Sequence, residues 1–276
     1  MDDFYAARAR ITADASLDGF LTAMHTFNSK WFSLGRAPAV MPPPQGHPVR
    51  MQAGSSQAGR DFGARWAEVI FTAQPLLELA REFHADINAR AANKGRCGAV
   101  RILPGLMPFI ASSRSEAQAA IEARSQGRGD VAKQLTEFLC IDITTLPPDI
   151  PIPLELLPPH GTTNGMRGRA DMMLDIVRRY RLTPRQVLAQ NAHLIFAGTP
   201  AETADLICQW FEEQACDGFT LMWPAPESCL LFTTQVIPIL QRRGVYRTSY
   251  EGPTLRDHFR LKRPVARPVC QDAVSS

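Results

Sequence analysis

The chain has 276 residues, 45% of them hydrophobic, which is enough to bury the core of one domain of moderate size or of two small ones. Its 30 basic and 27 acidic residues leave a net charge of +3, a balance without the basic excess of nucleic-acid-binding proteins. No apolar run approaches the ~18 residues of a membrane span, and the N-terminus has no hydrophobic signal core, so we expect a cytoplasmic protein with neither nucleic acid nor membrane as partner.

Cysteine and histidine spacing gives no indication of a metal site. The cysteines include no Cys-x-x-Cys pair, and successive histidines are more than 20 residues apart. We therefore expect reduced thiols, as is usual in the cytosol, and no bound metal ion. The residues concerned are Cys97, Cys140, Cys208, Cys216, Cys229, Cys270, His25, His47, His84, His160, His193 and His258.

The N-terminal part of the chain divides into a helical segment and a proline-rich link. Residues 1–37 are predicted to be a helical segment, because apolar residues such as Phe4, Ala7 and Ile11 recur at broadly helical spacing. The prolines that follow, up to Pro48, remove backbone donors and favour turns.

A strand, a turn and a helix follow directly after this link. Residues 49–53 are largely apolar and predict a strand, which Gly54-Ser55-Ser56 ends. Residues 57–67 predict a helix with Ala58, Phe62 and Trp66 as its buried stripe, and 68–72 predict a second strand. A small-residue turn before a helix can bind an anion such as phosphate through free backbone N–H groups. A plain strand–helix turn with a serine cap is the alternative.

Two further strands and several helices are predicted beyond residue 72. Residues 100–103 predict a strand closed by a Pro104-Gly105 turn, and 219–222 predict the last strand. The helices are predicted at 75–92, from Ser113, at 168–180, from Thr183, from Thr199 and at 227–243, with a kink at Pro238. The proline-rich excursion 142–165 is either a lid or binding loop, or an ordered arm packed on the rest of the fold or on a second subunit. A flexible tail is expected at 265–276.

Several segments together resemble one enzyme family. They are PQGHPVRMQAGSS, GRDF and AEVIFTAQ within 44–74, ILPGLMPFI at 102–110, GTPAETADLICQWFEEQACDGFTLM at 198–222 and VIPILQRRGVYRTSYEGPTLRDHFRL at 236–261. The family is that of nitrilotriacetate monooxygenase, the dibenzothiophene-sulfone monooxygenases and the pristinamycin synthase large subunits, a branch of the bacterial-luciferase-like (β/α)8 barrels. The matches stand in the family's order and cover most of residues 38–264.

The resemblance implies an α/β fold that is a partial (β/α)8 TIM barrel of the luciferase-like type. Only four strand–helix units are predicted, whereas a complete barrel has eight. The chain is therefore expected to be truncated, with 38–264 forming the C-terminal part of the barrel: strands five to eight with helical insertions.

The function that the resemblance implies is that of the large, oxygenase subunit of a two-component, FMNH2-dependent monooxygenase. The implied partners are O2, a small organic substrate and a separate NAD(P)H:flavin reductase that supplies reduced FMN, and the protein would be a homo-oligomer. The FMN phosphate would lie on Gly54, Ser55 and Ser56, while Phe71 and Thr72 would face the same barrel mouth. Catalytic residues stay unassigned, because in the family the first four strands contribute to the flavin-ring and substrate site. The alternative is a non-catalytic barrel remnant or assembly partner.

Overall fold

The computed structural model describes residues 27–28, 33–34, 44–125, 136, 139–160, 167–189 and 193–264. The predicted flexible tail and nearly all of the predicted N-terminal helical segment lie outside these ranges. The chain divides into two units, one made of Met1–Val49 with Tyr250–Ser276 and the other of Arg50–Ser249. No helix in the described ranges combines the length and apolar character needed to cross a membrane.

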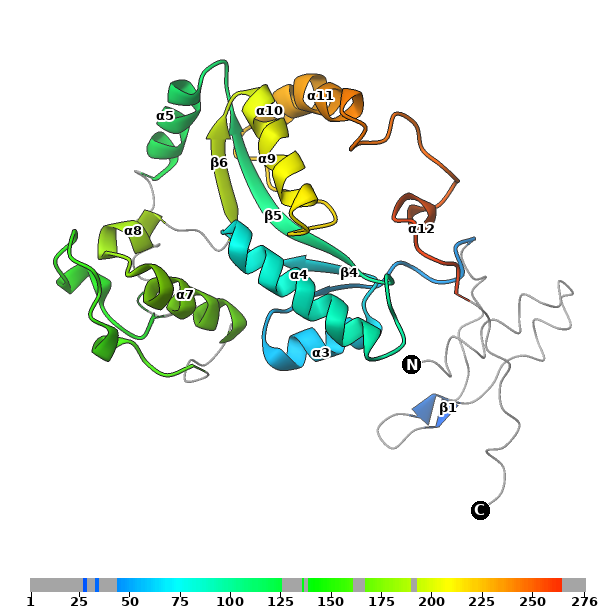
Figure 1. The fold of residues 1–276 in the computed structure, drawn as a ribbon, viewed down its shortest axis with the longest axis horizontal. Helices are drawn as coiled ribbons and strands as arrows, with labels where there is room; N and C mark the ends of the chain where they lie inside the picture. Colours follow the sequence, from blue (N-terminus) through cyan, green and yellow to red (C-terminus); the bar gives the residue numbers. More distant parts are fainter. Residues whose placement is uncertain are drawn as a thin grey trace, which may run out of the picture. The chain divides into compact units, whose positions relative to one another are not determined.

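The larger unit is built on a five-stranded sheet in which every pair is parallel (Figure 1). The order is β3-β4-β5-β6, and β7 also pairs with β5. Its strands are β3 (Met51–Ala53), β4 (Val69–Thr72), β5 (Arg101–Ile110), β6 (Leu194–Gly198) and β7 (Thr220–Leu221). The predicted parallel α/β sheet is confirmed, with β6 as a strand that the sequence interpretation missed.

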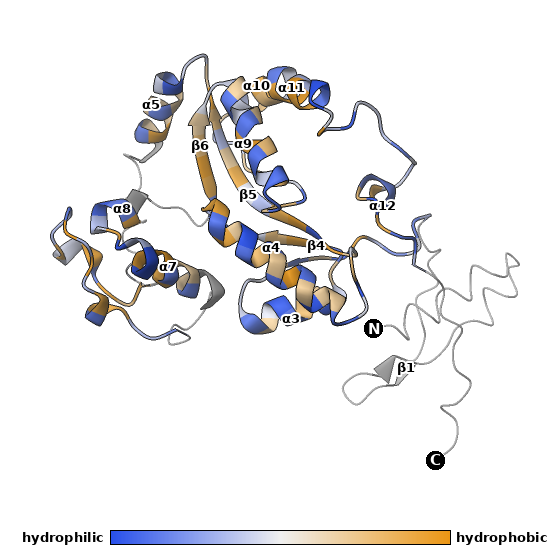
Figure 2. Cartoon of the chain, viewed as in Figure 1, coloured by the Kyte–Doolittle hydropathy of each residue, from blue (hydrophilic) through white to orange (hydrophobic). Residues whose placement is uncertain are grey.

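Helices follow the strands and cover the sheet. Along the strands hydrophobic residues predominate, whereas helices such as α3 and α4 mix hydrophilic and hydrophobic residues (Figure 2). Among the described residues, the α- and π-helices of this unit are α3 (Gln57–Trp66), α4 (Leu77–Ala92), α5 (Arg114–Ser125), α7 (Arg167–Tyr180), α8 (Pro184–Ala189), α9 (Pro200–Glu212), α10 (Pro226–Leu231), η3 (Phe232–Val236) and α11 (Ile237–Arg242). The predicted helix 227–243 contains the π segment η3, which ends at Val236, two residues before Pro238.

The face that α3 buries differs from the predicted stripe. Ala58 and Phe62 are exposed, whereas Gly63 and Ala64 are buried against the sheet. A β-carbon at Gly63 would lie 2.9 Å from Ile70 Cδ1, so the helix backbone approaches the strand too closely for large side chains. The aromatic spacing was therefore the wrong guide, because small residues form this contact.

Helix α4 follows its prediction. Phe83 and Ile87 are buried and pack with Ile70 and Ile102 of the neighbouring strands, and the buried Ala80 packs with Leu106 of β5. Their spacing of three and four residues places them on one helix face, toward the sheet.

Strand β5 continues through the predicted Pro104-Gly105 turn, so that prediction was wrong. Peptide groups alternate sides along a strand. Backbone groups of three even-numbered residues of β5 form hydrogen bonds with Asp217, Met222 or Ser228. These residues are Ile102, Leu106 and Ile110. Pro104 and Pro108 share that side, where β7 pairs only with Gly105 and Leu106. The strand therefore keeps its ladder to β4 and β6 on the other side.

The described part of the proline-rich excursion is an ordered arm. The 3-10 turn η1 (Ile143–Thr145) packs with α7 and α8 around a core of its own, and a second turn, η2 (Leu154–Leu156), has no buried residue. The buried residues of this core are Leu139, Ile143, Ile152, Leu157, Met173, Leu174, Ile176, Val177, Leu182 and Val187. Leu76 and Leu79 pack against it, which places the arm beside α4.

The smaller unit contains β1 (Phe27–Asn28), antiparallel to β2 (Ser33–Leu34), and α12 (Leu255–His258). Arg256 of α12 is 1% exposed, and its Nη2 donates to the carbonyl oxygen of His47. This contact ties the segment before β3 to the segment after α11.

We predict that Gly105→Ala destabilises the fold by about 1–3 kcal/mol, because its β-carbon would lie 2.5 Å from His193 Nδ1 and 2.9 Å from Met222 Cε. Urea unfolding measures the change in free energy. Adding His193→Ala should recover part of the loss by removing the collision. A Gly105→Ala variant as stable as the original chain would contradict this packing.

Candidate functional site

The Gly54-Ser55-Ser56 turn joins β3 to the N-terminus of α3. Ser56 is the N-cap residue, and its Oγ accepts a hydrogen bond from the Gly59 N–H at 3.2 Å. The N–H groups of the first helical turn have no acceptor within the helix and carry the positive end of the helix dipole. The serine cap expected of a plain turn is present, and the same turn offers donors to an anion.

Close packing accounts for the glycines around this turn. A β-carbon on Gly54 would collide with Gln52 Nε2 and would lie 3.5 Å from Gly59 Cα. A β-carbon on Gly59 would lie 3.2 Å from the Gly54 carbonyl carbon. The strand end and the first helical turn thus meet backbone to backbone, which also leaves the turn's N–H groups uncovered by side chains at these two positions.

Arg60, the arginine beside the turn, forms hydrogen bonds with other groups of the protein. Arg60 Nε donates to the Ser55 carbonyl oxygen at 2.8 Å, and its Nη1 contacts Asp86 Oδ2 at 2.9 Å. Burial opposes ionisation of Asp86, yet hydrogen bonds from Arg90 and Arg60 hold the pKa of this carboxyl below its usual value. The carboxylate therefore compensates the Arg60 charge, and the turn presents mainly neutral donors.

The register of the sheet brings the five predicted cofactor-binding residues to one edge. Ala53, Phe71 and Leu103 lie in one row across β3, β4 and β5, and Thr72 lies level with Pro104. The turn begins one residue beyond that row. All five therefore lie at or just beyond the C-terminal ends of β3 and β4, the end of the strands at which α/β proteins bind ligands.

Phe71 and Thr72 point to opposite faces of the sheet, because successive residues of a strand alternate. Ile70, and with it Thr72, faces the helices, where Thr72 is 4% exposed and accepts a hydrogen bond from Gln74 Nε2 at 3.1 Å. Phe71 is on the opposite face of the sheet, called here the inner face. Its ring stacks on that of His193, with the two ring centroids 5.3 Å apart. The structure therefore places Phe71, and not the Thr72 side chain, on the inner face.

His193 and Met222 join Phe71 on the inner face, and the sequence interpretation did not group them. Both side chains lie against Gly105, and a β-carbon on this residue would collide with each of them. Glycine inside a strand often marks such a close approach, so Gly105 was the available signal. It was taken for a turn because a proline precedes it.

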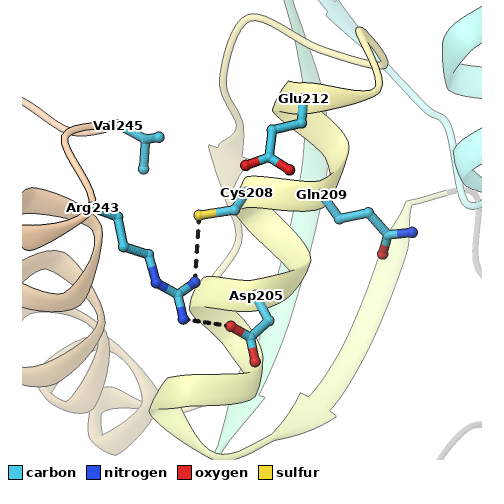
Figure 3. A pocket seen from close by; sticks show the side chains of 6 residues that line it. All are labelled: Asp205, Cys208, Gln209, Glu212, Arg243 and Val245. Carbon is cyan, nitrogen blue, oxygen red and sulfur yellow. Dashed lines mark hydrogen bonds and ion pairs between the residues drawn. The ribbon is translucent and has the colours of Figure 1, made fainter.

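A hollow of ≈ 380 Å³ lies on the outer helices α9 and α11 and not at the strand ends (Figure 3). Its lining residues are Asp205, Cys208, Gln209, Glu212, Arg243 and Val245. Arg243 donates to Asp205 Oδ1 at 2.5 Å and to Cys208 Sγ at 3.5 Å (Figure 3). These contacts link α9 to the end of α11, and none of the lining residues belongs to the predicted site.

The described residues include no group of three His, Cys, Asp or Glu side chains that could hold a metal ion. Burial raises the pKa of the Cys216 thiol to about 12, so this cysteine is a neutral thiol at physiological pH.

We predict that Ser56→Ala lowers the free energy of unfolding by about 1 kcal/mol, because α3 loses its cap. Ser56→Asn, which keeps a capping oxygen, should stay close to the original stability. Urea unfolding followed by circular dichroism compares the pair. Equal losses in the two variants would mean that the cap contributes nothing.

We also predict that Cys216 resists alkylation by iodoacetamide at pH 8 in the folded chain, since the neutral thiol is a poor nucleophile. The exposed Cys97 should react, and in urea both should react. Mass spectrometry of the digested protein measures the labelling. Rapid native labelling of Cys216 would show that the thiol is accessible.

Comparison with known proteins finds similarity to monooxygenases. The family model for luciferase-like monooxygenases matches residues 2–217, beginning well upstream of residue 38. Nitrilotriacetate monooxygenase component A of Aminobacter aminovorans is 41% identical and aligns with 84% of this chain and 53% of its own length. N-acetyl-S-(2-succino)cysteine monooxygenase of Bacillus subtilis is 40% identical, over 88% of this chain and 57% of its own.

Solved structures of related proteins also resemble this chain. EDTA monooxygenase from Chelativorans sp. BNC1 superposes with a TM-score of 0.66 at 31% identity, over 87% of this chain and 57% of that one. Riboflavin lyase, solved with modified FMN and riboflavin, gives a TM-score of 0.69 at 29% identity, over 88% of this chain and 54% of that one. The chain thus spans about half the length of the curated relatives it matches. The chain belongs to the luciferase-like monooxygenase family.

Proposed function

We propose that the chain binds the phosphate of FMN on Gly54, Ser55 and Ser56, as part of the large subunit of a two-component, FMNH2-dependent monooxygenase. The observation that carries the proposal is the N-terminus of α3, which follows a parallel strand through a turn of small residues and has first-turn N–H groups without acceptors within the helix. The similarity to a structure that holds modified FMN supports the choice of ligand.

The residues present fit the phosphate end of this cofactor. Ser55 and Ser56 carry hydroxyl donors, and Phe71 offers an aromatic face on the inner side of the sheet. Reduced FMN, when bound, would supply the oxygen chemistry, while the chain binds and orients it. Thr72 would contribute through its backbone, because its side chain faces the helices.

The remaining parts of the proposal follow from the family. The substrate would be a small organic molecule oxygenated with O2, and a separate NAD(P)H:flavin reductase would provide the reduced flavin. We further propose a homo-oligomer in the cytoplasm.

An open strand edge favours assembly with further strands. Among the described strands β3 pairs only with β4, and Met51 on its inner face is 57% exposed. We propose that β3, β4, β5 and β7 are barrel strands five to eight, with β6 as an addition, and that more strands continue the sheet at β3. The same edge supports the second candidate function, an assembly partner without activity of its own.

FMN titration of the intact chain, followed by flavin fluorescence, tests the proposed function. Ser56→Ala should weaken FMN binding by roughly 1 kcal/mol, about fivefold, through loss of one donor. Ser56→Asp keeps the cap but adds a negative charge, so it should weaken FMN binding at least about tenfold.

Riboflavin, which lacks the phosphate, is the matched control and should bind equally well to all three forms. Absence of saturable FMN binding by the unaltered chain would contradict the enzyme proposal for this form. Unchanged FMN affinity in Ser56→Asp would place the phosphate elsewhere.

A further inference from the structure

Arg60 fastens the turn at residues 54–56 to the neighbouring helix α4. Its Nε donates a hydrogen bond to the Ser55 carbonyl oxygen at 2.8 Å, and its Nη1 lies 2.9 Å from Asp86 Oδ2. The guanidinium carbon also lies 4.8 Å from the centroid of the Phe83 ring, a cation–π contact with the same helix. One side chain of α3 thus holds a backbone group of the turn and two side chains of α4.

A second arginine fixes the other end of this clamp. Arg90 Nε donates to Asp86 Oδ1 at 2.7 Å, so both carboxylate oxygens of Asp86 have a charged donor. The same guanidinium reaches the first helical turn of α3, where it contacts Asp61 Oδ1 at 2.8 Å and Gln57 Oε1 at 2.6 Å. Charge-assisted hydrogen bonds of this kind are short and directional, so the clamp has a defined geometry.

The bond to the Ser55 carbonyl determines where the next peptide N–H points. The Ser55–Ser56 peptide is trans, so its carbonyl oxygen and its N–H point in opposite directions. Because the oxygen is directed at Arg60, the Ser56 N–H is directed away from it. No acceptor for the N–H groups of Ser55 or Ser56 lies among the described residues. The clamp therefore leaves these donors available on the side of the turn opposite Arg60.

The clamp acts by geometry and not by attracting an anion. Two arginines face two aspartates, so the cluster carries no net charge. Its members are Arg60, Arg90, Asp61 and Asp86. The Arg60 Nε and Nη1 groups are already bonded within the protein, to Ser55 and Asp86.

We propose that Arg60, held by Asp86, is a positioning residue for the phosphate of flavin mononucleotide, because it binds the Ser55 carbonyl and so directs the Ser56 N–H at that phosphate. Neither side chain contacts the ligand, and their effect reaches it through the Ser55–Ser56 peptide. The inference rests on the proposed function and adds to it the contacts that orient the turn.

Charge and geometry predict opposite results for Asp86→Asn. The substitution removes a negative charge near the turn, which by electrostatics alone tightens FMN binding, whereas loss of the clamp weakens it. We expect FMN to bind about three- to tenfold more weakly, with riboflavin within about twofold of its original affinity. Fluorescence titration of the full chain measures both ligands. Tighter or unchanged FMN binding by Asp86→Asn overturns the inference.

Arg60→Lys separates the charge of the arginine from its shape. Lysine keeps the positive charge but lacks the planar fork that bonds a carbonyl and a carboxylate together. FMN should therefore bind about three- to tenfold more weakly to this variant too, again without a matching loss for riboflavin. Original FMN affinity in Arg60→Lys would show that only the charge matters, which also overturns the inference.

Glu82→Gln is the matched control. It removes a carboxylate from the same helix α4 and breaks an ion pair with Arg179 of 2.8 Å, away from the turn, so neither affinity should change. Circular dichroism checks folding, and Arg60→Gln replaces the lysine variant if that one does not fold. Equal losses of FMN and riboflavin affinity in the Asp86 and Arg60 variants would assign the clamp to structural support and overturn its positioning role.

A separate measurement distinguishes this inference from the proposed function. If the unaltered chain binds no flavin, the proposed function fails, and inorganic phosphate then serves as the probe. Phosphate should raise the unfolding temperature of the original chain and of Glu82→Gln but not that of Asp86→Asn. An equal rise in all three, or no rise in any, overturns the positioning role.

Discussion

The parallel register of β3, β4 and β5 is the constraint on which the candidate site depends. It aligns Ala53, Phe71 and Leu103 in one row, so the segments that leave the first two strands start at the same edge. A shift of one residue would turn each side chain to the other face and would take Phe71 away from His193. The apolar contacts of Ile70 and Ile102 with α3 and α4 hold this register, because their burial fixes which face is which.

Close approach through glycine is the second organising feature. Gly63 brings α3 onto Ile70, Gly54 meets Gly59 at the turn, and Gly105 admits His193 and Met222 to the inner face. Each contact replaces side-chain volume by backbone proximity, which makes the geometry stiff. The turn that presents its N–H groups is therefore set by packing on both sides and not by loop residues alone.

The local elements were largely accessible from the sequence. The helix caps at Ser56 and Thr199 depend on residues within a few positions of one another. The predictions were wrong where contacts between segments distant in sequence determine the structure. Pro104 is compatible with β5 because its nitrogen faces the side where β7 is short, and the burial of Gly63 depends on Ile70 in another strand.

The sequence by itself determined the strand–turn–helix around Gly54-Ser55-Ser56, the parallel α/β character and the family, because these follow from local spacing and from ordered motifs along the chain. Only the tertiary structure decided which side chains share the site. It separated Thr72 from Phe71 by strand alternation, set His193 against Phe71, and bound Arg60 to helix α4 beside the turn. The physical reason is that such contacts join segments distant in sequence, whose proximity is fixed by register and by the space that glycines leave.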